Sequence, residues 1–170
     1  MFTKADIEKY FIAEKNESIL FMLAGVVAIG VGLFFLIYYK SSFARGMAIP
    51  LLAIAAIHFV IGFTVFRRSD EQRTTQVYSY DMDPHALMTN EVPRMNGVMK
   101  NFVVLRWVEI GLAVSGLLLI LFFRRNEAQQ LWYGAGFGLF LQAMLSLVLD
   151  FFAEKRGHEY LDGLKSFLKM

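Results

Sequence analysis

Four long apolar runs limit what this chain can fold into more than any other feature of its sequence. A helix needs about 20 residues to cross roughly 30 Å of hydrocarbon, and we place such runs at 18–39, 47–66, 101–123 and 131–152. Backbone polar groups in lipid have to bond within their own segment, so runs of this length are helical. The sequence therefore predicts an all-α protein that crosses a bilayer as a bundle of four transmembrane helices.

Short polar turns at 40–45 and 124–127 separate the first run from the second and the third from the fourth. Turns this short bring consecutive helices side by side, so we expect two antiparallel helical hairpins in one integral membrane domain, 1–170. A central loop, 67–100, joins the hairpins. We expect 67–80 to be irregular, and a helix to begin with Asp83 as its N-cap and Pro84 as its first residue.

Both ends of the chain carry a short amphipathic pattern that predicts a helix outside the bilayer. Thr3 and Asp6 have the spacing of a capping box, which indicates a helix leading into the first span. In the tail, 157–170, apolar side chains share one helical face and lysines the other. Such a tail lies on an anionic membrane surface or packs on the loops of its own bundle. The apolar residues of the tail are Tyr160, Leu161, Leu164, Phe167 and Leu168.

Lysine and arginine residues are distributed unequally between the two sides of the predicted bundle. Most of them lie in the N-terminal segment, the central loop and the tail. Cytoplasmic loops carry the excess of basic residues, so we expect both termini and the central loop in the cytoplasm, with the protein in the inner (plasma) membrane of a bacterium. The two turns hold only Lys40, Arg45, Arg124 and Arg125.

Composition excludes several classes of site. The chain has no cysteine, which excludes disulfides, thiolate zinc sites and iron–sulfur clusters. Its formal net charge is only +2, and the basic residues flank apolar runs instead of forming one stripe, which does not fit a nucleic-acid-binding protein. One histidine within a span gives little support for haem. We expect no cofactor, no metal and no nucleic-acid partner.

Polar residues inside the apolar runs are the candidates for a functional site, because a charge at the centre of a bilayer costs about 2.5–3.5 kcal/mol on insertion scales. His58, Glu109 and Gln142 each lie about 12 Å from the cytoplasmic end of their helices, so we expect one polar layer. Arg106 is one turn nearer the cytoplasm on the face of Glu109, which predicts an i, i+3 ion pair. Asp150 is expected at the mouth of the layer.

Small residues repeat every three or four positions in each run, which is the pattern of helices that pack closely in lipid. We interpret the glycines of these stripes as packing residues that need no further function. They include Gly25, Gly32, Gly62 and Gly116, and the pair Gly134 and Gly138 with GxxxG spacing.

The polar layer has two interpretations. In the structural one, Arg106 and Glu109 neutralise each other, His58 bonds to Gln142, and the layer only fixes the order of the helices. In the functional one, side chains from three helices line a pocket open to the cytoplasm that holds a ligand, an ion or a proton.

Three classes of function follow. We favour a channel- or carrier-like protein, paired with further copies or another membrane protein in the bilayer, that binds an ion, a lipid or another small ligand. Its site would comprise His58, Arg106, Glu109, Gln142 and Asp150. The alternative is a non-catalytic interaction protein, such as an assembly factor, a sensor subunit or an immunity-type protein. A membrane enzyme acting on a lipid-like substrate has the least support, because no nucleophile or metal cluster accompanies the polar residues.

Overall fold

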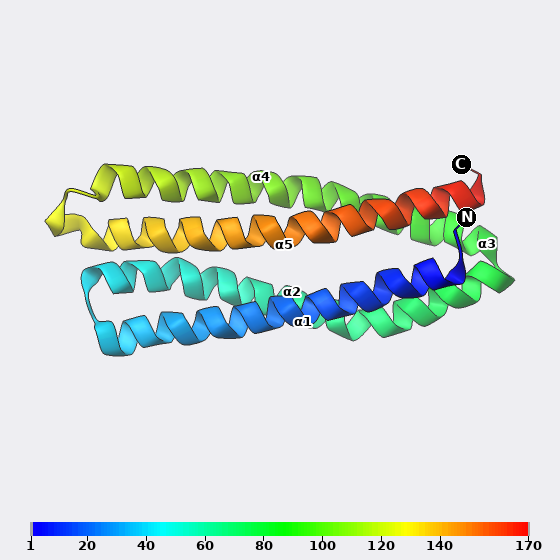
Figure 1. Cartoon of the computed structure of the whole chain (residues 1–170), viewed down its shortest axis with the longest axis horizontal. Coiled ribbons are helices and arrows are strands. Elements are labelled where there is room, and N and C mark those ends of the chain that lie inside the picture. The colour runs from blue at the N-terminus through cyan, green and yellow to red at the C-terminus, as the bar shows by residue number, and fades with distance from the viewer. Residues whose placement is uncertain (1, 170) are drawn as a thin grey trace.

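The computed structural model describes residues 2–169, and within them every regular element is helical (Figure 1). The four long helices are α1 (Lys4–Phe34), α2 (Ser42–Met82), α4 (Val92–Phe123) and α5 (Gln130–Leu168). All four are long and apolar enough to cross a membrane. They lie side by side in an elongated bundle, with α1 packed along α2 and α4 along α5. The predicted all-α fold with four long apolar helices is confirmed.

The bundle has two different ends. At one, which we call the turn end, the π-helical turn η1 (Phe35–Tyr39) leads from α1 into α2, and the 3-10 turn η3 (Glu127–Gln129) leads from α4 into α5. The other, the terminal end, holds both chain termini and the connection from α2 to α4 (Figure 1). That connection consists of the short helix α3 (Pro84–Ala86), capped by Asp83 as predicted, and the π-helical turn η2 (Leu87–Glu91).

Helix α2 continues through the segment that was expected to be irregular, 67–80, and ends only at Met82. The hydroxyls of Thr74 and Thr75 donate to backbone carbonyls one turn earlier, at 3.0 and 2.9 Å, so these polar residues are accommodated in a helix. An ion pair between Lys15 and Asp70 ties the segment to α1. The expectation of an irregular loop is therefore wrong, because packing against a neighbouring helix outweighs weak local helix propensity.

The tail is not a separate helix, since α5 runs from Gln130 to Leu168 without a break. Its apolar face is buried in a cluster at the terminal end that we call the terminal core. Of the two alternatives for the tail, packing on the bundle is the one observed. The terminal core consists of Phe2, Ile7, Tyr10, Phe11, Leu87, Val92, Met95, Met99, Tyr160, Leu161 and Leu164.

A buried ion pair lies within the terminal core. Glu91 accepts hydrogen bonds from Nε and Nη2 of Arg94, both at 2.7 Å, and from the hydroxyl of Tyr160 at 3.0 Å. The ring of Tyr160 stacks on Tyr10 with the centroids 4.1 Å apart. Burial raises the pKa of both phenols, which keeps them neutral. The start of α1, the α2–α4 connection and the end of α5 are joined here.

Helices α1 and α2 exchange places beside α5 along the bundle (Figure 1). Near the turn end α2 contacts α5, where Gly138 lies directly against the backbone of Met47. Near the terminal end α1 contacts α5 instead, through an ion pair between Glu17 and Arg156. The exchange takes place in the middle of the bundle, where the candidate site is found.

Candidate functional site

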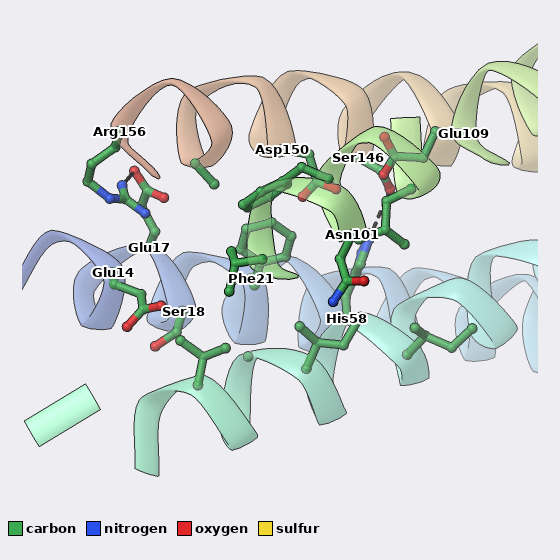
Figure 2. Close-up of a pocket in the computed structure, with 18 of the residues that line it drawn as sticks. Glu14, Glu17, Ser18, Phe21, His58, Asn101, Glu109, Ser146, Asp150 and Arg156 are labelled. Atoms are coloured by element: carbon green, nitrogen blue, oxygen red, sulfur yellow. Dashed lines mark hydrogen bonds and ion pairs between the residues drawn. The ribbon is translucent and has the colours of Figure 1, made fainter. Parts of the chain in front are cut away.

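A cavity of about 440 Å³ lies in the middle of the bundle and is lined by side chains from all four long helices (Figure 2). Its polar lining includes His58 of α2, Glu109 of α4, and Ser146 and Asp150 of α5. Apolar side chains of α2 and α4 form most of the remaining wall. Of the predicted site residues, His58, Glu109 and Asp150 are therefore brought to one cavity.

His58 is buried and both of its ring nitrogens have partners. Nδ1 lies 3.2 Å from Nε2 of Gln142, and Nε2 lies 2.9 Å from Oγ of Ser146. The Ser146 hydroxyl donates its only hydrogen to the carbonyl of Gln142 at 3.0 Å. It therefore accepts a hydrogen bond from Nε2 of His58, which places the ring proton on Nε2. The predicted contact between His58 and Gln142 is confirmed, and Ser146, which was not among the predicted site residues, completes it.

Glu109 is only 8% exposed, and its Oε2 accepts no hydrogen bond from the described part of the chain. The carboxyl group of Asp150 meets that of Glu109 across the contact between α4 and α5. No lysine, arginine or histidine within residues 2–169 forms an ion pair with either acid. Two adjacent carboxylates repel each other unless a positive group or a proton lies between them.

The predicted ion pair between Arg106 and Glu109 is wrong. Arg106 pairs with Glu154 of α5, and about half of its side chain is exposed. The two positions are three residues apart on α4, but the long arginine side chain reaches across to α5 while the shorter glutamate stays beside Asp150. Arg106 lines a separate, smaller hollow of about 100 Å³ together with Glu109 and Asp150.

Two ion pairs lie where the cavity approaches the terminal end. Arg156 of α5 pairs with Glu17 of α1, and Arg68 of α2 lies 3.9 Å from Glu14 of α1. All four side chains belong to the cavity lining. Figure 2 shows Arg156 and Glu17 on the same side of the cavity as Glu14, away from His58 and Glu109. The pairs connect three helices at this side of the cavity.

Sequence reasoning did not find the pairing of Glu17 with Arg156. Glu17 and Arg156 are separated by 139 positions. Both stand just outside apolar runs, where charged residues usually serve as anchors at the membrane surface. Only the contact between α1 and α5 brings them together, and no local signal reports that contact.

The lining combines apolar walls with an excess of unpaired acid. The two arginines of the lining are each held by a glutamate, which leaves Glu109 and Asp150 without a basic partner. Within residues 2–169 no group of three or more His, Asp or Glu side chains is placed to hold a metal ion. Such a site can bind a group that is positively charged or that donates hydrogen bonds.

Comparisons with known protein families, with curated proteins and with solved structures found no match to this chain.

Proposed function

We propose that the protein is an integral membrane protein of four spans, arranged as two antiparallel hairpins, that binds a small ligand or ion in the cavity as a channel- or carrier-like protein. Its terminal end lies in the cytoplasm and its turn end on the outer side of a bacterial inner membrane. The cavity then lies in the cytoplasmic half of the bilayer, where three of the predicted polar residues line it.

Helix lengths and surface composition support insertion in a bilayer. Helix α2 has 41 residues, which corresponds to about 60 Å, twice the hydrocarbon thickness, so part of it extends into water. Large apolar side chains are exposed all along 19–37, 57–63 and 103–122. Lipid is the environment in which such surfaces are stable.

One observation carries the ligand-binding proposal: within residues 2–169 the buried Glu109 meets only another acid, Asp150, and its Oε2 has no hydrogen-bond partner, beside a cavity large enough for a small molecule. Buried polar groups in stable proteins are almost always paired, and an unpaired one costs about 1–3 kcal/mol or more for a charge. The structural interpretation accounts for His58, Gln142 and Ser146, whose hydrogen bonds are complete. It does not account for Glu109 and Asp150, whose partner would come from a ligand.

The same contacts weigh against an enzyme that uses His58 as its base. Neither ring nitrogen is free to accept a proton from a substrate, because one accepts from Gln142 and the other donates to Ser146. Binding a ligand does not require either nitrogen of His58 to be released from its hydrogen bond.

A matched pair of variants tests whether the cavity holds a ligand. Val108 lines the cavity and is 51% exposed, whereas Val104, one turn away on α4, is 60% exposed and lies outside the lining. Val108→Trp should fill the cavity and Val104→Trp should only add surface. Mass spectrometry of small molecules released from the purified protein should find one compound with the wild type and Val104→Trp and lose it with Val108→Trp. Equal retention by Val108→Trp, or no compound above a detergent blank, would count against the proposal.

A further inference from the structure

We propose that the ligand of this cavity is an organic cation with an apolar body, whose positive group is held by Glu109 and Asp150. This inference rests on the proposed function and names the chemical class of the ligand. It follows from the charges, walls and opening of the cavity.

The charge of the lining is unbalanced in one place only. Arg68 and Arg156 are both engaged by glutamates of α1, so neither is free to balance the acids deeper in the cavity. Arg106, the remaining nearby cation, is turned to Glu154. A positive group beside Glu109 and Asp150 would relieve the repulsion between their carboxylates.

The remaining lining fits an organic body better than a bare ion. A volume of about 440 Å³ holds many atoms, and a metal ion would need a cluster of ligands that residues 2–169 do not provide. Apolar side chains such as Ile54, Leu105 and Leu112 form the wall around the acids. Phe102 also lines the cavity, and aromatic rings favour organic cations through their negative faces.

The cavity opens to the side of the bundle between α2 and α4. Ile57 of α2 and Val108 of α4 both line it, yet they are 57% and 51% exposed, so the cavity reaches the outer surface between them. In a bilayer this opening faces lipid, and molecules that partition into lipid carry an apolar body.

Three probes of similar shape and different charge test the inference. They are benzyltrimethylammonium, the uncharged neopentylbenzene and the anionic phenylmethanesulfonate. Binding is measured by titration calorimetry with the full chain in phosphatidylcholine nanodiscs. The cation should bind at least about tenfold more tightly than either other probe, because it alone places a positive charge beside the two carboxylates and near the ring of Phe102.

Isosteric variants identify the residues responsible. Glu109→Gln and Asp150→Asn should each weaken benzyltrimethylammonium binding about tenfold, and the double variant should lose the preference for the cation over neopentylbenzene. Glu159→Gln serves as the matched control, because Glu159 is an exposed acid of α5 outside the cavity. Its affinity should equal that of the wild type.

Each other outcome has a definite meaning. Cation binding that persists in the double variant, or a cation that binds no better than neopentylbenzene, would overturn the inference; the second result would indicate that a proton between the acids already balances them. If neopentylbenzene binds and Val108→Trp abolishes that binding, the cavity is a binding site and the proposed function stands without cation preference. If the wild type does not bind benzyltrimethylammonium, the inference fails, and the molecule retained on purification then decides the proposed function separately.

Discussion

At the scale of single residues, the polar groups inside the bundle fall into two sets. His58, Gln142 and Ser146 satisfy one another, and such a set adds stability and fixes which helices meet. Glu109 and Asp150 have only each other. The sequence indicated which polar residues are candidates for a site, because a polar or charged side chain within an apolar run has a free-energy cost in lipid. It could not predict how they pair, because pairing depends on the rotation and neighbours of each helix.

The pairing of Arg106 gives a direct test at this scale. A double-mutant cycle with Arg106→Leu and Glu154→Leu should show a coupling of about 1 kcal/mol or less, since Arg106 is partly exposed and an exposed pair contributes little. The corresponding cycle with Glu109→Leu should show a smaller coupling, because Arg106 and Glu109 do not pair. Reversible unfolding in mixed detergent micelles measures both cycles. A larger coupling to Glu109 than to Glu154 would restore the pairing expected from the sequence.

At the scale of helices, the stripes of small residues mark the contacts that hold neighbouring helices together. A methyl group added to Gly25 would lie 2.9 Å from the carbonyl oxygen of Ala55, and one added to Gly62 would lie 2.8 Å from that of Ser18. Helices α1 and α2 therefore approach to backbone contact on the faces predicted from residue spacing. Tight packing explains these glycines, as the sequence indicated.

Substituting two glycines of α4 distinguishes the effect of packing on stability from that of helix propensity. A Cβ on Gly116 would lie 2.7 Å from the backbone nitrogen of Phe140, whereas one on Gly111 meets nothing within 4 Å. Gly116→Ala should destabilise the protein by about 1–3 kcal/mol, because α5 has to move away. Gly111→Ala should leave stability unchanged or raise it by at most about 1 kcal/mol through helix propensity. Thermal unfolding in detergent compares the two, and equal effects would contradict the close approach of α4 and α5.

Helix ends were predicted less well than helix positions. The apolar runs were located because lipid imposes a minimum length, but the polar continuation of α2 through Thr74 and Thr75 was expected to be irregular. Its stability comes from α1 alongside it, a contact between distant parts of the chain. The tail shows the same limit, since its apolar face was found from the sequence while its partner, the terminal core, was one of two alternatives.

At the scale of the whole molecule, the bundle combines two kinds of interior. The terminal end has a core of large apolar side chains around Glu91 and Arg94, as in a water-soluble helical domain. The turn end is held by glycine contacts such as that of Gly46 with Leu131, which suit lipid. The cavity lies between these two regions, at the level where α1 and α2 exchange places beside α5.

For the proposed membrane protein, orientation decides which side of the bilayer the terminal end faces, and cysteine labelling can determine it. The chain has no cysteine, so each single substitution reports one position only. Ser42 and Asn126 are exposed at the turn end, and Thr75 is exposed on the extension of α2 at the terminal end. If the distribution of basic residues sets the topology, an impermeant maleimide should label Ser42→Cys and Asn126→Cys in intact cells, and Thr75→Cys only after lysis. The reverse pattern would place the terminal core and the ion pairs of Arg68 and Arg156 outside the cell. The proposed orientation would then be wrong.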